Sequence, residues 1–124
     1  MTPFGQRVRA LREARGMSLA QMAEGLGVSP AYLSALEHGK RGRPTFTLIQ
    51  GTIHLLGVIW DEADELVRLA DLSHPRVIID TARLDPEATL LANRLSREIA
   101  LLEEEDLRRL AAILDEVAAR RDPA

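Results

Sequence analysis

Residues 17–39 read MSLAQMAEGLGVSPAYLSALEHG, and this stretch decides the fold. Ser18 is a residue type that caps the beginning of a helix. Gly27 can end that helix in a left-handed backbone conformation that other residues avoid. Ser29 caps the next helix, and Pro30 follows at its first position, where the missing backbone N–H costs nothing. The stretch therefore predicts two short helices separated by a very short turn.

The apolar residues of the same stretch suit two helices in close contact. Helices joined by a turn of roughly three or four residues cross steeply, which is the geometry of a helix-turn-helix. Ala23 is small enough to lie where two such helices touch. The second helix has apolar residues that can anchor it to a core, namely Val28, Leu33 and Leu36.

Helical periodicity continues on both sides of this stretch. The apolar face of the preceding helix is formed by Phe4, Val8 and Leu11. Gly16 can end that helix, and Thr45 can cap a later one that ends at Gly57. We therefore expect four helices within residues 2–57, followed by a fifth that reaches residue 72.

The stretch resembles the Cro/CI-type (XRE) helix-turn-helix family of phage and bacterial regulators. The family pattern, hydrophobic-Ser/Thr-Gln-x-x-Leu-Ala-x-x-Leu-Gly-Val-Ser-x-x-Tyr-Ile-Ser-x-x-Glu-x-Gly, is matched here over nearly its full length by residues 17–39. The resemblance extends to the first helix and to the loop that ends Arg43-Pro44-Thr45, and so covers residues 4–57. One departure is Leu19, because the family usually has Gln at this position.

The resemblance implies that the helix from Ser29 to His38 enters the major groove of double-stranded DNA. Matched residue by residue, the positions that read bases are Pro30, Ala31, Ser34 and Ala35. The polar side chains near them belong to Ser29, Ser34, Tyr32 and His38. Since Pro and Ala side chains offer only apolar contact, best to a thymine methyl group, we expect few direct hydrogen bonds to bases and a large contribution from DNA shape.

A basic loop follows the reading helix, and it predicts contacts to the DNA backbone. Lys40, Arg41 and Arg43 lie where the family places its loop against phosphates. Ser18 and the N-terminus of the helix that it caps offer a second phosphate contact. The alternative interpretation of the loop is a solvated basic turn.

Arg12 and Glu37 are expected to have a structural role. Arg12 lies on the otherwise apolar face of the first helix, and Glu37 is near the end of the reading helix. In the family, the matching Arg and Glu form an ion pair beneath the DNA-facing surface, and the resemblance implies the same pair here.

Charge is distributed unevenly along the chain, whose net charge is −3. Residues 1–57 hold seven basic and three acidic residues, a net charge of +4, whereas residues 58–124 hold nine and sixteen, a net charge of −7. This asymmetry favours a basic half that meets a polyanion, although charge also varies along chains without functional consequence.

The C-terminal half has helical signals of its own. Residues 77–79 are β-branched and read either as a short strand or as an extended connector. Asp85-Pro86-Glu87 is a helix start. One apolar stripe is formed by Ala88, Leu91, Leu95, Ile99 and Leu102, and a second, out of phase with it, by Leu107, Leu110, Leu114 and Val117. The phase change predicts two helices rather than one long rod.

These two stripes require a surface that covers them. A twofold homodimer would bury them and place two reading helices about one DNA turn apart. The stripes could instead pack onto the chain's own N-terminal part. A third interpretation is an antitoxin-like module whose acidic C-terminal helices bind a partner protein, and RNA polymerase or another protein is a possible partner as well.

Several other functions find no support. The chain has no Cys, and its three His residues have no carboxylates at metal-ligand spacing, so neither a metal nor a cofactor is expected. Lys40 is the sole lysine, and nothing forms a general acid–base pair, so we do not expect an enzyme. No segment approaches the roughly 20 apolar residues of a membrane span, and the N-terminus does not resemble a signal peptide. The expected location is the cytoplasm, in association with the nucleoid.

The sequence thus predicts an all-α protein with a Cro/CI-like helix-turn-helix bundle followed by a C-terminal helical dimerisation region. We expect the DNA-binding domain at residues 1–72 and the helical region at residues 73–124. The expected function is that of a sequence-specific transcriptional regulator, a repressor or an activator, which binds a pseudo-palindromic operator in double-stranded DNA as a homodimer.

Overall fold

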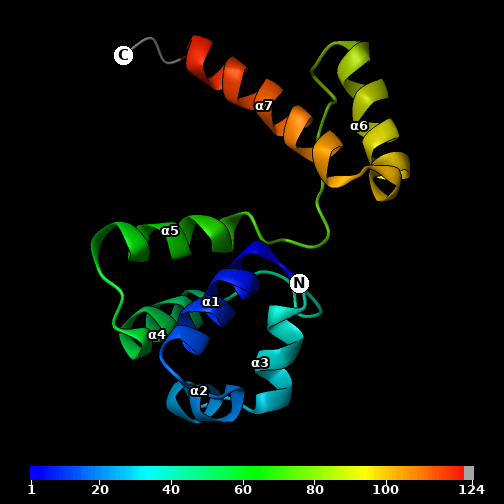
Figure 1. The fold of residues 1–124 in the computed structure, drawn as a ribbon. Coiled ribbons are helices and arrows are strands. Elements are labelled where there is room, and N and C mark those ends of the chain that lie inside the picture. The colour runs from blue at the N-terminus through cyan, green and yellow to red at the C-terminus, as the bar shows by residue number, and fades with distance from the viewer. Residues whose placement is uncertain (122–124) are drawn as a thin grey trace. The chain divides into compact units, whose positions relative to one another are not determined.

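Helices form all of the regular secondary structure within residues 1–121, the part of the chain that this computed structural model describes. The expected all-α fold is therefore confirmed. The chain divides into two compact units, Met1–Val77 and Ile78–Ala124 (Figure 1). The final residues of the expected C-terminal region, 122–124, lie outside the described residues. None of the described helices is both long enough and apolar enough to cross a bilayer.

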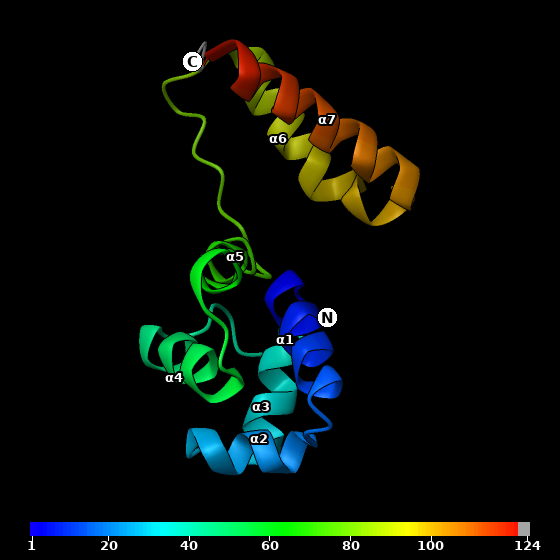
Figure 2. The same ribbon diagram turned by 60° about the vertical axis from the view of Figure 1, so that its left-hand side comes forward.

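The first unit contains five helices, which are α1 (Pro3–Ala14), α2 (Leu19–Leu26), α3 (Pro30–Glu37), α4 (Phe46–Leu56) and α5 (Trp60–Asp71). In both Figure 1 and Figure 2, α2 and α3 cross steeply, as the short turn between them requires. A single core joins all five helices, and its largest members include Phe4, Met22, Leu33, Ile49 and Leu66. The backbone N–H of Phe4 donates a hydrogen bond to Ser73 Oγ at 2.9 Å, so the chain after α5 is attached to the start of α1.

The predicted helix caps are present. Ser18 forms a capping box at the start of α2, and its Oγ accepts a hydrogen bond from the backbone N–H of Gln21 at 3.1 Å. Ser29 caps α3 in the same way, with Pro30 at the first helical position. Gly27 ends α2 with a φ of 71°, in the left-handed region that favours glycine. Local sequence therefore sets the turn that precedes α3.

Close helix contacts add a constraint that the sequence patterns did not indicate. Gly5 of α1 lies against the backbone of α3, where a Cβ atom would be 2.3 Å from the carbonyl oxygen of Glu37. Gly25 of α2 leaves room in the same way for Leu55 of α4, whose Cδ1 would lie 2.8 Å from an added Cβ. These glycines let α3 and α4 approach their neighbours more closely than side chains would allow.

The second unit contains α6 (Pro86–Glu98), the 3₁₀ helix η1 (Ile99–Leu101) and α7 (Glu104–Arg121). The two predicted helices are confirmed. The strand interpretation of residues 77–79 is wrong, because residues 1–121 contain no β-strand and this segment is an extended connector. α6 and α7 enclose a hollow of about 150 Å³, lined in part by Leu91, Leu95 and Leu110.

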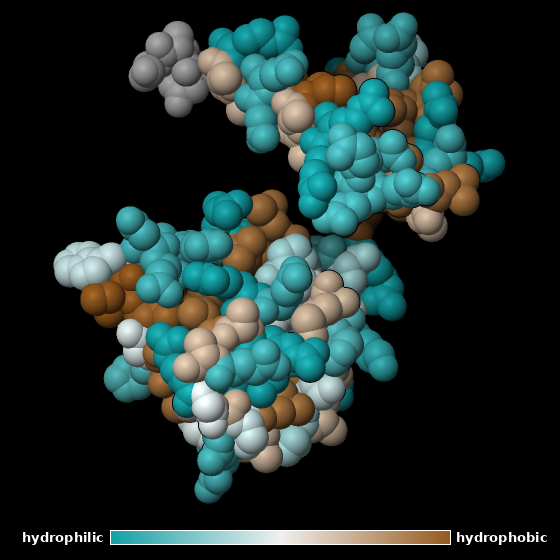
Figure 3. Space-filling model, in the orientation of Figure 1, coloured by the Kyte–Doolittle hydropathy of each residue, from teal (hydrophilic) through white to brown (hydrophobic). Residues whose placement is uncertain are grey.

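This second unit has no core of its own. No residue between 78 and 121 is buried. Members of both predicted stripes remain accessible, with Leu91 55%, Ile99 54% and Leu114 71% exposed. Apolar side chains reach the surface of this unit in Figure 3. The stripes therefore lack the cover that an amphipathic helix needs for stability in water.

The contact between α1 and α3 gives a first prediction. Replacement of Gly5 by Ala should destabilise the fold by about 1–3 kcal/mol, because the added Cβ would clash with backbone rather than with a movable side chain. In an unconstrained helix the same change would stabilise by about 1 kcal/mol, so the expected sign is opposite to that of helix propensity. Urea unfolding followed by circular dichroism measures the difference.

The exposed neighbour Gln6 is the control for this substitution. Gln6→Ala should change the free energy of unfolding by no more than about 0.5 kcal/mol. A Gly5→Ala variant as stable as the unmodified chain would contradict the close approach of α1 and α3.

Candidate nucleic-acid interface

α3 has one buried side and one accessible side. Leu33 and Leu36 are each 2% exposed and anchor the helix to the core. The predicted reading positions lie outside this anchor, with Ser29, Pro30, Ala31 and His38 exposed and Ser34 and Ala35 half-buried. The structure thus places the predicted reading positions on the accessible side of one helix, whose opposite side packs against the core.

Polar groups on this helix are already partly engaged. The Oγ of Ser29 accepts a hydrogen bond from the backbone N–H of Tyr32 at 3.0 Å. His38 Nδ1 lies 2.8 Å from the carbonyl oxygen of Ser34. A capping hydroxyl still carries a proton that it can donate, so Ser29, like Ser18 on α2, keeps the ability to bind a phosphate oxygen. The accessible side of α3 is therefore mostly apolar with a small number of hydroxyl donors.

Tyr32 is placed differently from the other predicted readers. It is half-buried and lines a hollow of about 450 Å³ between α2, α3 and α4. Thr45 and Thr47 at the start of α4 line the same hollow, together with Ser29. Sequence patterns did not indicate this hollow, because it forms between residues of three separate helices.

The three cations of the basic loop have three different environments. Lys40 is exposed. Arg41 is exposed as well, but its Cζ lies 5.5 Å from the centroid of the Tyr32 ring, in a cation–π contact. Arg43 is half-buried and forms an ion pair with Asp71, the last residue of α5. The three residues are neighbours in sequence and were predicted to act together, whereas in the structure each has a different environment.

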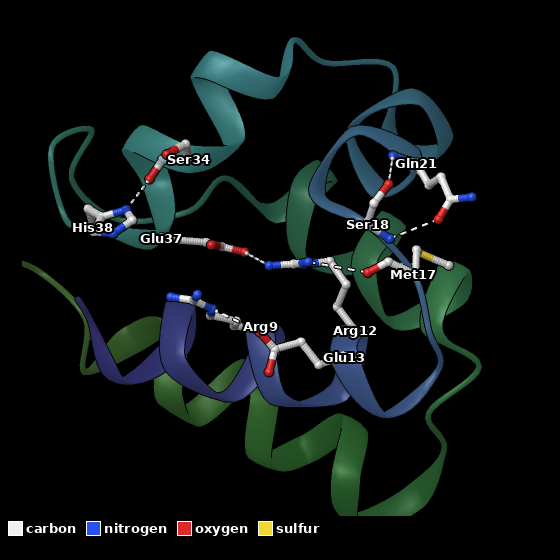
Figure 4. A network of polar contacts seen from close by, with 9 residues as sticks. All are labelled: Arg9, Arg12, Glu13, Met17, Ser18, Gln21, Ser34, Glu37 and His38. Carbon is white, nitrogen blue, oxygen red and sulfur yellow. Dashed lines mark hydrogen bonds and ion pairs between the residues drawn. The ribbon is translucent and has the colours of Figure 1, made fainter.

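Arg12 and Glu37 face one another beneath α3 (Figure 4). Their side chains are 10% and 5% exposed, and Arg12 Nη2 lies 3.8 Å from Glu37 Oε1. Arg12 Nη1 also donates a hydrogen bond to the carbonyl oxygen of Met17 at 3.2 Å, so one guanidinium reaches both α3 and the segment before α2. Arg12 Nε and Glu37 Oε1 have no hydrogen-bond partner.

Burial affects the pKa of the Glu37 carboxylate more strongly than the charge of Arg12 does. It raises the pKa of Glu37 above the ordinary value of 4.5, and the nearby charge of Arg12 lowers the pKa by less than burial raises it. This direction agrees with a separation of 3.8 Å, which is too long for a charge-assisted hydrogen bond. The pair therefore connects α1 to α3 at an electrostatic cost, and removal of one partner would strand the other.

Comparison with known proteins places the first unit in a described family. A family model described as a helix-turn-helix domain matches residues 3–72. The HTH-type transcriptional regulator RghRB of Bacillus subtilis is 41% identical over 61 residues, which are 49% of this chain and 44% of that protein. The HTH-type transcriptional repressor RghR of the same organism is 50% identical over 44 residues, covering 36% and 33% of the two chains. The chain thus spans less than half of either relative.

Two further similarities involve proteins named SinR. The HTH-type transcriptional regulator SinR of Bacillus licheniformis is 32% identical over 66 residues, covering 50% of this chain and 60% of that one. A solved structure entitled SinR protein/SinI protein complex aligns with 95% of this chain and 97% of its own, with a TM-score of 0.45 and 23% identity.

The buried ion pair gives a prediction about stability. Arg12→Ala should cost about 3–5 kcal/mol of unfolding free energy at neutral pH, because it leaves Glu37 buried and uncompensated. The matched control is Arg9→Ala on the same helix, whose exposed pair with Glu13 is worth less than about 0.5 kcal/mol. Chemical denaturation of the two variants compares these costs. If Arg12→Ala unfolds at the same denaturant concentration as Arg9→Ala, the buried pair has no structural role.

Proposed function

We propose that this chain, which belongs to the helix-turn-helix domain family, is a sequence-specific regulator of transcription that binds double-stranded DNA through α3. The observation that carries the proposal is the placement of this helix. Its inner side is fixed by Leu33, Leu36 and Glu37, and its outer side presents the residues that the family places over base edges. Residues 1–72 would form the DNA-binding part.

The outer side of α3 supports a particular kind of readout. Pro30 and Ala31 are exposed and cannot donate or accept hydrogen bonds through their side chains. They would contact thymine methyl groups, and the hydroxyls of Ser29 and Ser34 would supply the polar contacts. Discrimination would therefore depend largely on the shape and deformability of the DNA.

Affinity would come mainly from the DNA backbone. Lys40 and Arg41 are exposed and directly follow α3. Ser18 at the N-terminus of α2 adds a hydroxyl and the positive end of a helix dipole. Arg43 belongs to the same predicted set, but its charge is already compensated by Asp71.

Binding to selected duplexes tests the function. Selection from a random-sequence duplex library with the full chain should enrich one motif. The affinity for this motif should fall with salt, with a log–log slope on the order of −7 for a dimer that makes about four phosphate contacts per protomer, or about −5 where Arg43 makes none. Fluorescence anisotropy at several salt concentrations measures this slope. The double variant Lys40→Gln/Arg41→Gln should bind all duplexes more weakly and with a shallower slope.

Arg83→Gln and Arg97→Gln together make the equivalent charge change on exposed sites of the second unit, and they should leave the slope unchanged. The regulatory proposal fails if the unmodified chain shows no salt-sensitive preference for any duplex.

The second unit supports a homodimer. Its apolar stripes are exposed along α6 and α7, so they need a partner. α7 also has acidic residues in its first turn and Arg120 and Arg121 in its last turn. Two copies of α7 packed antiparallel would place opposite charges next to each other and bury the α7 stripe of each copy, and the α6 stripe could extend the same interface. Such a twofold dimer suits a pseudo-palindromic operator.

Analytical ultracentrifugation tests the dimer. The full chain should sediment at twice its mass of 13.7 kDa, and Leu114→Glu should shift it to the monomer by placing a charge within the stripe. Ala112→Glu, an exposed α7 position off the stripe, should leave the dimer intact. A chain that stays monomeric at every concentration contradicts the dimer. A stable one-to-one complex with a different protein through residues 86–121 would favour the antitoxin-like alternative.

A further inference from the structure

Arg41 is the loop cation that is both accessible and held in place. Its guanidinium lies over the Tyr32 ring, with 5.5 Å between Cζ and the ring centroid. A guanidinium over an aromatic ring is attracted by the face of the ring and keeps all of its N–H donors, and those of Arg41 have no hydrogen-bond partner within the described residues. Those donors remain free to bind a phosphate or a base edge. Tyr32 belongs to α3, so the stack also fixes where Arg41 lies relative to the reading helix.

Arg43 is held by quite different contacts. Its Nε donates a hydrogen bond to Asp71 Oδ1 at 3.0 Å, and its Nη2 approaches the same oxygen. Its Nη1 donates to the carbonyl oxygen of Pro44 at 3.0 Å, and Pro44 is buried. All three guanidinium nitrogens therefore have a partner within the first unit. These contacts attach the loop to the end of α5.

We propose that the basic loop contacts DNA through Arg41, whose side chain is positioned by its contact with the Tyr32 ring. Arg43 stays bound to Asp71 and anchors the loop. The proposal deepens the DNA-binding function and rests on it. It makes Tyr32 a positioning residue rather than a base reader, and it takes Arg43 out of the set of phosphate contacts.

Two physical arguments support this division. A side chain ordered before binding loses less conformational freedom when the complex forms. Arg41, in contact with Tyr32, should therefore contribute more than Lys40, which is exposed and has no such contact within the described residues. The charge of Arg43, in contrast, is compensated by Asp71, and a phosphate bound at Arg43 would also lie close to that exposed carboxylate. Repulsion between these like charges would offset the new contact.

A double-mutant cycle on the selected operator tests the aiming role. Tyr32→Leu should weaken binding by roughly two- to fivefold per half-site, the effect of an exposed cation–π contact. Arg41→Gln should weaken binding at least as much, and Tyr32→Leu should then have no further effect in the Arg41→Gln background. Tyr32→Phe keeps the ring and should bind within about twofold of the unmodified chain. Equal losses from Tyr32→Leu with and without Arg41 would overturn the proposal.

A readout without DNA separates this inference from the proposed function. The ring current of Tyr32 should shift the NMR signals of the Arg41 δ-methylene protons upfield in the free chain, and Tyr32→Leu should abolish that shift. Absence of the shift in the unmodified chain would contradict the stack even if DNA binding is strong. A chain that shows the shift but binds no duplex would contradict the regulatory function while leaving the stack intact.

Asp71→Asn tests the anchor. It should lower the thermal stability of the first unit. The matched control is Asp64→Asn, which removes the same charge from another exposed position of α5. The two variants should have the same operator affinity and the same salt slope. A tighter complex with a steeper salt slope, beyond that of Asp64→Asn, would show that Asp71 holds Arg43 back from DNA and would overturn the assignment.

Discussion

Glu37 connects α1 and α3 in three ways, and the position of α3 depends on all of them. Its carbonyl oxygen accepts a hydrogen bond from the backbone N–H of Thr2 at 3.0 Å. The same carbonyl lies against Gly5, where no side chain would fit. Its carboxylate lies opposite Arg12 in a setting where burial disfavours charge. Backbone, packing and charge therefore hold the C-terminal end of α3, while the turn at Gly27 holds the other end.

A helix held at both ends can present a mostly apolar surface without losing its orientation. Pro30 and Ala31 give α3 little ability to orient itself through hydrogen bonds to bases. In the proposed complex with DNA, orientation would come from the protein and from contacts to the DNA backbone instead. In this respect the buried anchor of α3 and the stacked Arg41 serve the same end, because both are ordered before any DNA is present.

Local features were predictable from sequence because they depend on neighbouring residues. The caps at Ser18 and Ser29 and the left-handed Gly27 are set within a few positions of the chain, and each was expected. The missed features join residues far apart in sequence. Arg43 and Asp71 are 28 positions apart, and no periodicity or motif relates them. Gly25 meets Leu55 of another helix, and such a contact depends on the relative placement of two helices rather than on either one.

Ion pairing also changes how the charge asymmetry of the sequence should be understood. Seven cations give residues 1–57 their net positive charge, but four of them lie in ion pairs, which are Arg7–Glu62, Arg9–Glu13, Arg12–Glu37 and Arg43–Asp71. Arg15 donates hydrogen bonds to the carbonyl oxygens of Leu56 and Leu11. Within the described residues, three cations of this half are exposed and have no carboxylate partner, namely Arg15, Lys40 and Arg41. The guanidinium of Arg15 is already bound to these two carbonyl oxygens, whereas Lys40 and Arg41 lie just after α3. Much of the uncompensated positive charge of residues 1–57 is therefore located beside the helix proposed to read DNA.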